Sequence, residues 1–316
     1  MIVLSENECR ERLSLELAYR AVERALVAAI DGSAAINPVV IARGLSEGEV
    51  FSIKSGAAHR ERIVGFKVGS YWPNNAAAGL APHGSSIFLL NPDTGRLMAT
   101  VEASRLNGTR TAAADAVAAH LLAKPTAATL TIIGAGHQAE FEAHALCAIR
   151  PIERIFLVAR DAARALPLRN KLAASLGIEV ATASAEQGCR EADILVTVTP
   201  ARAPLFEADW VRPGTHVASM GSDQAGKQEL PPALLLRSRL FCDLPRQSLT
   251  IGEFQHVRSA VENGSIAVTA IGEVLLGRAS GRSSADEITV FDSSGLALQD
   301  LFIAASLLQA SHEEHA

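Results

Sequence analysis

A glycine-rich segment in the middle of the chain has the residue types needed to bind a phosphate group. Residues 134–139 read Gly-Ala-Gly-His-Gln-Ala and directly follow the apolar, β-branched run 129–133. Gly134 would permit a tight turn, Gly136 would let the backbone approach a pyrophosphate, and Ala139 is small enough for a helix to pack closely on a sheet. The same pattern occurs in purely structural turns, but a strand before it and a helix after it predict a dinucleotide-binding turn.

The choice of dinucleotide depends on the end of the next predicted strand, at residues 155–159. An acidic residue at this strand tip holds the ribose diol of NAD, whereas an arginine offers a cation and a stacking surface to the 2′-phosphate of NADP. The chain has Arg160 followed by Asp161 here. We therefore expect NADP or NAD as the cofactor, with NADP slightly favoured. In the alternative, Arg160 only covers the sheet edge and Asp161 binds NAD.

Four cationic side chains lie in the predicted structured parts of the N-terminal region. Lys54 and Lys67 lie inside apolar runs, where an unpaired charge is costly unless it faces an anionic ligand. Arg43 follows another apolar run, and Arg110 opens an Ala-rich helix, where its planar guanidinium could bind a carboxylate through two parallel hydrogen bonds. Each of them taken alone is an ordinary surface charge. Together they predict a binding site for a small anion.

These residues must be positioned by regions with different patterns. Apolar residues at helical spacing over 8–31 predict an amphipathic opening helix, and short apolar runs separated by turns over 36–103 predict an antiparallel β region. An Ala-rich run over 109–123 predicts a helix that Pro125 ends. A linker at this proline would separate a first domain, 1–124, from a second.

Beyond residue 125 the chain alternates between short apolar runs and longer helical segments. Strands are predicted at 128–133, 153–159, 178–182 and 193–198, with helices at 138–149, 162–176 and 185–191. This alternation is typical of a parallel, doubly wound sheet. The predicted fold class is therefore α/β, with a Rossmann-type doubly wound parallel sheet plus a second, α+β domain.

Length, charge and composition narrow the classes of function. The 316 residues are long for one globular unit and suit two domains. The net charge of −5 comes from 34 acidic and 29 basic residues without a long run of one sign, which argues against nucleic acid and membrane surfaces as partners. No apolar stretch reaches the ~18 residues of a spanning helix, and the N-terminus does not read as a signal peptide, so we expect a cytoplasmic protein. The four cysteines lack the spacing of a metal site, and no metal is expected.

The motifs, taken in chain order, resemble the ornithine cyclodeaminase/μ-crystallin family. The resemblance covers nearly the whole chain, and its motifs are Gly65–Lys67, Tyr71–Asn75, Arg110–Ala113, Gly134–Gln138, Gly221–Asp223, Gly226–Leu230 and Phe291–Gly295. It implies a homodimer in which the N-terminal domain, completed by the C-terminal helix 296–316, supplies both the subunit contact and the substrate site. It also implies an NAD(P)-binding Rossmann domain over 125–295 that faces this site across a cleft.

The resemblance also implies roles for single residues. The expected substrate-binding residues are Arg43, Lys54, Lys67, His83 and Arg110, with the two arginines and Lys67 on the carboxylate of a small imino or amino acid. Asp223 would be the catalytic acid/base, and Lys67 is a second catalytic candidate. The expected cofactor-binding residues are Thr111, Gly134, Ala135, Gly136, His137, Gln138, Arg160, Thr197, Thr199, Met220 and Ser293.

The role implied for Asp223 agrees with the chemistry of imine reduction. Hydride transfer to a C=N carbon requires a polarised imine and a protonated nitrogen, so a carboxyl group beside that nitrogen can stabilise the iminium or deliver the proton. Without the resemblance, Asp223 in the sequence Gly-Ser-Asp-Gln at 221–224 would be interpreted as a turn-forming aspartate.

Two departures from the cyclodeaminase members of the family bear on the reaction. Pro82 stands where those enzymes carry a hydroxyl residue, and Lys54 stands where a neutral residue is expected in them. A pocket with an added cation would repel the second amine of ornithine. We therefore expect an NAD(P)H-dependent reductase of small α-imino acids, of the iminosuccinate or Δ1-pyrroline-2-carboxylate type. The alternatives are an ornithine cyclodeaminase, which is an ammonia-lyase that recycles its NAD, and a non-enzymatic NADPH-binding protein like μ-crystallin.

Overall fold

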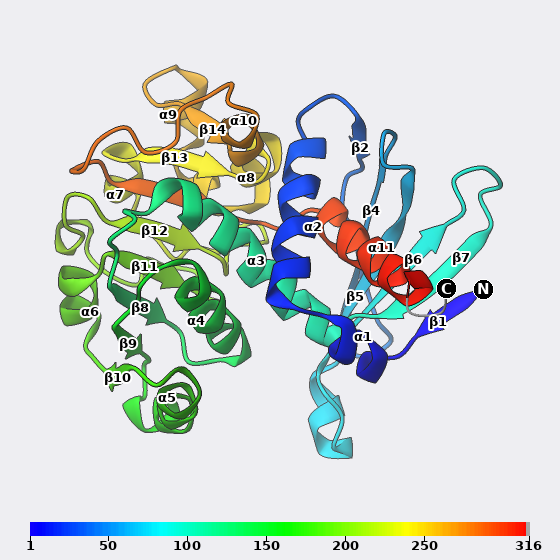
Figure 1. The fold of residues 1–316 in the computed structure, drawn as a ribbon. Coiled ribbons are helices and arrows are strands. Elements are labelled where there is room, and N and C mark those ends of the chain that lie inside the picture. Colours follow the sequence, from blue (N-terminus) through cyan, green and yellow to red (C-terminus); the bar gives the residue numbers. More distant parts are fainter. Residues whose placement is uncertain (314–316) are drawn as a thin grey trace. The chain divides into compact units, whose positions relative to one another are not determined.

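The computed structural model describes residues 1–313, and the chain forms two compact units (Figure 1). The first unit comprises Met1–Arg110 together with the C-terminal segment from Leu296, and the second comprises Thr111–Gly295. No helix among the described residues combines the length and the apolar character needed to span a bilayer. The second unit is thus inserted, in sequence, into the first.

The boundary between the units lies within a helix, earlier than the position predicted after residue 124. Helix α3, Ser104–Leu122, runs through the boundary at Arg110. The last carbonyl groups of a helix have no partner within it. In the second unit, the guanidinium of Arg150 donates to the carbonyl oxygen of His120 at 2.7 Å. Because the C-terminal half of α3 is bound in this way, it belongs to the second unit.

The first unit is built on a seven-stranded sheet. Its strands are β1 Ile2–Leu4, β2 Ala34–Ile36, β3 Val40–Arg43, β4 Val50–Ala58, β5 Ile63–Tyr71, β6 His83–Leu90 and β7 Leu97–Glu102. The order is β1-β7-β6-β5-β4-β2, with β3 also paired to β4. Strand β1 is parallel to β7 and the other pairs are antiparallel, which confirms the antiparallel region predicted over 36–103.

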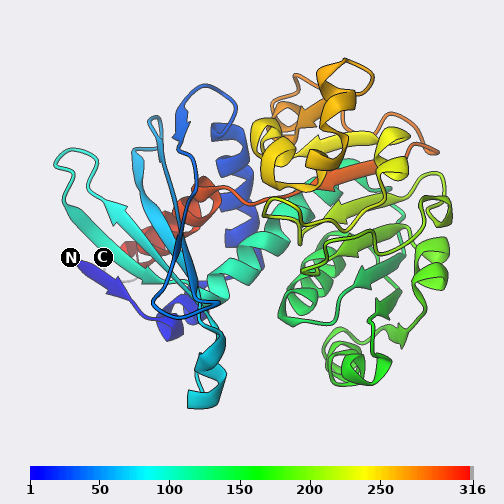
Figure 2. The ribbon, with the colours of Figure 1, turned by 180° about the vertical axis from the view of Figure 1, so that it is seen from behind.

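The two faces of this sheet differ. Helix α11, Ala297–Glu313, packs on β4, β5 and β6, and helix α2, Leu15–Ala28, packs on α11 (Figure 2). Successive side chains of a strand point to opposite faces. Ile87 is therefore buried toward α11, whereas Phe66 and Phe88 point the other way, are only partly buried, and stack with ring centroids 4.9 Å apart.

The segment predicted as one helix over 8–31 forms two helices, α1 Glu6–Arg12 and α2. The side chain of Ser14 accepts a hydrogen bond from the backbone amide of Leu17 at 3.0 Å. This N-cap satisfies an amide that a helix start leaves without a partner, so a new helix begins after Ser14. The first unit also contains a short 3-10 helix, η1, at Pro73–Ala78.

The second unit is built on an eight-stranded sheet in which every pair is parallel. Its strands are β8 Thr129–Ile133, β9 Arg154–Val158, β10 Glu179–Thr182, β11 Ile194–Thr197, β12 His216–Ser219, β13 Arg239–Cys242, β14 Val268–Ala270 and β15 Thr289–Asp292. The order is β10-β9-β8-β11-β12-β15-β13-β14. The predicted doubly wound parallel sheet is confirmed.

The connections between these strands are mostly helical. The α-helices are α4 His137–Ile149, α5 Ala162–Leu176, α6 Ala185–Glu191, α7 Pro232–Leu236, α8 Pro245–Ile251, α9 Arg258–Glu262 and α10 Ile271–Leu275. Two 3-10 helices, η2 Ala208–Trp210 and η3 Glu253–Val257, complete the unit. The helices predicted up to residue 191 lie where the sequence patterns placed them.

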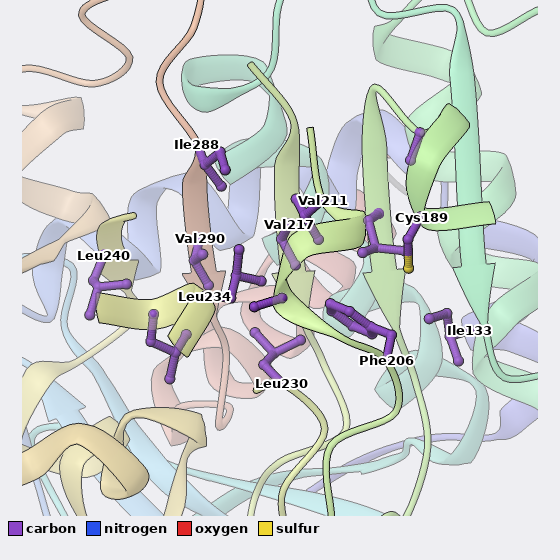
Figure 3. Packing of buried hydrophobic residues seen from close by; sticks show 14 of the residues in the cluster. Ile133, Cys189, Phe206, Val211, Val217, Leu230, Leu234, Leu240, Ile288 and Val290 are labelled. Carbon is purple, nitrogen blue, oxygen red and sulfur yellow. The ribbon is translucent and has the colours of Figure 1, made fainter. Parts of the chain in front are cut away.

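The core of the second unit lies between this sheet and the segments that cover it (Figure 3). Val217 and Val290 on neighbouring strands pack with Leu230 and Leu234, and all four are fully buried. Apolar burial of this kind stabilises a fold by about 25 cal/mol for each Å² removed from water. The core is built mainly from aliphatic side chains, in keeping with the low aromatic content of 4%, although Phe206 and Phe254 also belong to it.

Leu234→Ala should lower the free energy of unfolding of the second unit by about 2–5 kcal/mol, because it leaves a cavity in this core. Leu236 lies on the same helix but is 53% exposed, so Leu236→Ala is a matched control with an expected change below about 0.5 kcal/mol. Urea unfolding followed by circular dichroism measures both. Equal losses in the two variants would contradict the core described above.

Candidate active site

The glycine turn predicted to bind a dinucleotide connects β8 to α4. Gly134 has a φ of +123°, and a Cβ atom there would lie 2.8 Å from the carbonyl oxygen of Val198, so this position requires glycine. Gly136 is the N-cap of α4 and makes no side-chain capping hydrogen bond, and a Cβ atom on it would meet nothing within 4 Å. The backbone there is accessible, and the first amides of α4 fit a pyrophosphate.

The residues expected to bind the cofactor gather at one edge of the parallel sheet, with one exception. Strands β9, β8, β11, β12 and β15 are consecutive neighbours, so their carboxyl ends meet at the same edge. Strand order reverses beside β8, and doubly wound sheets bind ligands outside this switch point. The expected residues at these strand ends are Gly134, Ala135, Gly136, His137, Gln138, Arg160, Thr197, Thr199, Met220 and Ser293. The exception is Thr111, which is buried within α3.

Several of these residues already have protein partners. The ring of His137 lies against Phe141 with centroids 4.9 Å apart. The side-chain amide of Gln138 donates to Glu142 Oε1 at 2.8 Å, and the hydroxyl of Ser293 donates to Asp243 Oδ2 at 3.3 Å. The structure thus holds these side chains in fixed positions along the candidate cofactor edge.

The two residues that follow β9 differ in what they contact. The carboxylate of Asp161 is the N-cap of α5 and accepts a hydrogen bond from the amide of Ala163 at 3.0 Å. It also lies 3.5 Å from the guanidinium of Arg164. Arg160 is exposed. The carboxylate that the sequence alternative assigned to the ribose of NAD is therefore engaged in capping a helix.

A group of buried carboxylates lies behind this edge, and the sequence interpretation missed it. Glu229, Glu253 and Asp292 are fully buried. Asp292 accepts the amide of Glu253 at 3.0 Å, and Glu253 accepts the amide of Glu229 at 3.1 Å. Burial raises the pKa of Glu253 to about 7, although the hydrogen bonds from the Leu230 and Glu229 amides act in the opposite direction. Asp292 thus binds the backbone of Glu253, and Glu253 binds the backbone of Glu229.

Glu229 binds the segments that follow β11 and β12. Its carboxylate accepts hydrogen bonds from the hydroxyl groups of Thr197, Thr199 and Ser219 at 2.9, 2.8 and 3.2 Å. It also accepts the backbone amides of Thr199 at 2.6 Å and Gly221 at 2.9 Å. Burial raises the pKa of Glu229, and these donors act to lower it. Thr197 and Thr199, two of the three threonines expected to bind the cofactor, are thereby fixed to Glu229.

Asp223, the expected acid/base, lies in the exposed loop after β12. Its side chain is 47% exposed, and its Oδ1 atom lies 2.6 Å from the ammonium of Lys227. The side chain of Lys227 is only 17% exposed. Asp223 is therefore accessible to a ligand and forms an ion pair within its own loop.

The cationic residues of the first unit form a buried cluster around Asp300 on α11. Oδ1 of Asp300 lies 3.0 Å from Nζ of Lys67 and 3.2 Å from Nε of Arg110. Both cations also donate to Oδ1 of Asn107, at 2.5 and 2.7 Å, and Arg110 donates to Gln299 Oε1 at 3.1 Å. Asp300 and the two cations are each at most 8% exposed. Two cations thus share one carboxylate.

Burial changes the titration of this cluster. It lowers the pKa of Lys67 to about 8; Asp300 opposes this shift, whereas Arg110 and Lys54 add to it. Burial alone would raise the pKa of Asp300, but Lys67 and Arg110 hold it below its usual value. Asp300 is therefore ionised at neutral pH, while the charge of Lys67 depends on pH slightly above neutral.

Sheet register relates the remaining expected substrate residues to this cluster. Lys54 is directly opposite Lys67, and directly opposite residues of antiparallel strands point to the same face. Across the sheet, Arg43 on β3 lies opposite Val50 on β4. Val50 lies opposite Tyr71 on β5, and Tyr71 lies opposite His83 on β6. Because Lys67 and Tyr71 are an even number of residues apart, Arg43, Lys54, Lys67 and His83 all belong to the face toward α11. Arg43 and His83 are exposed, and His83 lies against Tyr71 with ring centroids 4.7 Å apart.

Three residues of the cluster, Asn107, Gln299 and Asp300, were absent from the sequence interpretation. The signal for Asp300 was present, because it lies in the apolar run 296–308, where an unpaired charge is costly. The same argument singled out Lys54 and Lys67. Asn107 precedes Arg110 by three residues, a spacing that places both on one side of a helix.

The glycine turn at the switch point of a parallel sheet places the second unit in the class of Rossmann-type dinucleotide-binding domains. A model of the ornithine cyclodeaminase/mu-crystallin family matches residues 1–314, and the chain belongs to this family. The resemblance found in the sequence is confirmed.

Relatives with solved structures match along almost the whole chain. The chain is 36% identical to the iminosuccinate reductase of Paracoccus denitrificans over 99% of its own length and 98% of that protein. The crystal structure of this reductase in complex with NAD+ has a TM-score of 0.92 and covers 99% of this chain and 97% of that one. The Δ1-pyrroline-2-carboxylate reductase of Thermococcus litoralis, in complex with NADH and L-proline, has a TM-score of 0.91 at 28% identity and covers 100% and 99%. An archaeal alanine dehydrogenase dimer with bound NAD has a TM-score of 0.90 at 30% identity and covers 100% and 97%.

Arg160→Ala should raise the KM for NADPH about 10-fold and change the KM for NADH less than about 2-fold, because only NADPH carries the 2′-phosphate that this side chain would bind. Arg164→Ala is a matched control on α5, since its side chain is 87% exposed. Steady-state kinetics with each dinucleotide measures the effect. An equal change for both dinucleotides would argue that Arg160 does not contact the phosphate.

Proposed function

We propose that this protein reduces a small α-imino acid to an L-amino acid with NADH or NADPH as the hydride donor. The iminosuccinate and Δ1-pyrroline-2-carboxylate reductases among its relatives support this reaction. The observation that carries the proposal is the buried cluster of Lys67, Arg110 and Asp300. Because two cations share one carboxylate there, the cluster attracts a further anion when Lys67 is protonated. The carboxylate of an imino acid supplies that charge.

The reduction also requires a hydride and a proton. The nicotinamide ring of a bound dinucleotide supplies the hydride to the imine carbon. Asp223 takes up a proton from solvent and passes it to the imine nitrogen, and the ammonium of Lys227, 2.6 Å away, orients the carboxyl group. Asp223 is exposed and follows β12 at the candidate cofactor edge. The nitrogen stays bonded to the reduced carbon as the amine of the product, so no ring closure or ammonia release is needed.

Lys54 favours a dicarboxylic imino acid such as iminosuccinate over a cyclic monocarboxylic one. It pairs directly with Lys67 across β4 and β5 and belongs to the same face of the sheet. A second carboxylate would balance this added cation, whereas the second amine of ornithine would be repelled by it. A cyclodeaminase is therefore disfavoured.

The direct test is NADH or NADPH consumption with iminosuccinate, formed from oxaloacetate and ammonia, and with Δ1-pyrroline-2-carboxylate. Turnover with either imine supports the reductase, and faster turnover with iminosuccinate supports the dicarboxylic substrate. Absence of turnover with both would overturn the proposal. In a parallel reaction with ornithine and catalytic NAD⁺, ammonia release would identify a cyclodeaminase instead. Tight dinucleotide binding without any turnover would indicate a binding protein.

The oligomer we propose is a homodimer formed through the sheet face that carries Phe66 and Phe88. The archaeal alanine dehydrogenase relative, described as a dimer, supports this assembly. Both rings are partly exposed although they are apolar, and contiguous apolar patches of this kind mark subunit contacts. A cytoplasmic location stays a prediction.

Asp223→Asn should lower kcat about 100-fold or more, because the amide cannot deliver a proton to the imine nitrogen. Binding of the dinucleotide should stay within about 2-fold, since the glycine turn is unchanged. Single-turnover kinetics and fluorescence titration with NADH measure the two quantities. Undiminished kcat would exclude Asp223 as the acid.

Binding of a carboxylate inhibitor should weaken as the pH rises through about 8, where Lys67 loses its proton. The charged form of Lys67 attracts the anion, while Asp300 favours this form and Arg110 and Lys54 oppose it. We expect the inhibition constant of succinate, which is fully ionised over this range, to rise roughly 10-fold between about pH 7 and about pH 9.5. The side chain of the Lys67→Arg variant stays charged over this range. The inhibition constant of succinate for this variant should therefore not change with pH. A level profile in the unmodified protein would argue against this role of Lys67.

Phe88→Glu should convert the dimer to a monomer, because the charge would be buried without a partner in the contact. Leu166→Glu on α5 of the second unit is the control, since Leu166 is 44% exposed. Light scattering after size-exclusion chromatography gives the mass of each. A dimeric Phe88→Glu variant would place the subunit contact elsewhere.

A further inference from the structure

The loop after β12 folds back on itself, so that two charged residues form hydrogen bonds with the segment that carries Asp223. Residues 221–223 form the outgoing part, and residues 227–229 return beside them. Lys227 and Glu229 lie on the returning part, two residues apart. Both contact the backbone of Gly221: Glu229 accepts a hydrogen bond from the Gly221 amide at 2.9 Å, and Lys227 donates to the Gly221 carbonyl oxygen at 3.2 Å.

Lys227 joins the backbone of this segment to its reactive side chain. Its ammonium donates to the Gly221 carbonyl oxygen and, at 2.6 Å, to Oδ1 of Asp223. One cation therefore fixes Asp223 relative to the backbone two residues earlier. The backbone carbonyl of Lys227 is itself bound by the ring of His256, 2.7 Å away. The returning part is thus held in place independently of Asp223.

Glu229 anchors the same segment to the sheet. Its carboxylate takes five hydrogen bonds, all from the ends of β11 and β12 and the residues that follow them. Its own amide and that of Leu230 are bound by the buried Glu253, at 3.1 and 2.8 Å. A fully buried carboxylate without these donors would cost several kcal/mol. The arrangement is stable only when all the donated groups are in these positions.

We propose that Lys227 and Glu229 are positioning residues that together hold the 221–223 segment, and with it Asp223, in the geometry required for proton transfer. We refer to this pair as the loop clamp. The inference rests on the proposed function, because it acts through Asp223 as the proton donor. Glu229 fixes the backbone of the segment, and Lys227 fixes the direction of the carboxylate. Loss of Lys227 leaves the dinucleotide turn after β8 intact, since that turn belongs to another strand. Loss of Glu229 also releases Thr197 and Thr199 on the segment after β11.

Hydrogen exchange tests the clamp without any reference to catalysis. Peptides that cover residues 219–224 are compared in the unmodified full-length protein, Lys227→Met, Glu229→Gln and the control Lys171→Met. Lys171 forms an exposed ion pair with Glu140 in the same unit, so its loss leaves the clamp unchanged. Both clamp variants should exchange at least about 10-fold faster in these peptides, and in Lys227→Met the β8 peptide should be unchanged. Exchange no faster than in the control would overturn the inference.

Kinetics tests whether the clamp acts through Asp223. Lys227→Met should lower kcat about 10-fold or more and leave the KM for NADH within about 2-fold, and Lys227→Arg, which keeps a donor and a charge, should restore most of the loss. In the Asp223→Asn background, Lys227→Met should cause no further loss, because the group it positions has been removed. A full additional loss in that background would overturn the inference.

The same variants separate the inference from the proposed function. If Asp223→Asn alone keeps full kcat, the assignment of Asp223 as proton donor fails, and hydrogen exchange then decides the clamp by itself. The side chain of Glu229 is buried, so the Glu229→Gln variant has the greater risk of unfolding. Thermal unfolding is therefore measured for each variant. Lys227→Met changes a partly exposed side chain and provides the decisive result where Glu229→Gln unfolds.

Discussion

The first unit depends on one shared carboxylate. Asp300 comes from the last helix of the chain, yet its Oδ1 atom contacts both Lys67 on β5 and Arg110 on α3. Without it, two cations would be buried against each other, which costs several kcal/mol per charge. The same atom leaves the cluster with a surplus of positive charge. Closure of the unit and its surplus of buried positive charge are therefore consequences of a single interaction.

The second unit uses buried carboxylates in a different way. Glu229, Glu253 and Asp292 bind mainly backbone amides and hydroxyl groups, and each fixes a segment beyond the carboxyl end of a strand. A parallel sheet brings these ends together but does not determine how the loops beyond them fold. The hydrogen bonds of these three carboxylates fix the conformation of the loops. The sheet thus determines where a nucleotide can bind, and the acidic residues determine the shape of the surrounding loops.

Most of the second unit could be predicted because its strands are buried on both sides and alternate with helices, a pattern that is local in sequence. The glycine turn at 134–139 was found for the same reason. The break at Ser14 was missed because apolar periodicity continues across it, although the serine itself was a capping signal. Glu229 could not be assigned, because its partners are amides and hydroxyl groups that become neighbours only in the folded sheet. The order of β13 and β14 depends on pairing and left no local signal.

The interruption of the first unit by the second has a consequence for biosynthesis. The strand that carries Lys67 is synthesised before the second unit, whereas the helix that carries Asp300 is synthesised after it. The inserted Rossmann unit is complete before that helix exists, and domains fold as units during synthesis. The cations of the nascent N-terminal sheet therefore lack their carboxylate partner until α11 has been made. A chain terminated within α11 would keep the whole of the second unit while leaving the first unit without part of its structure.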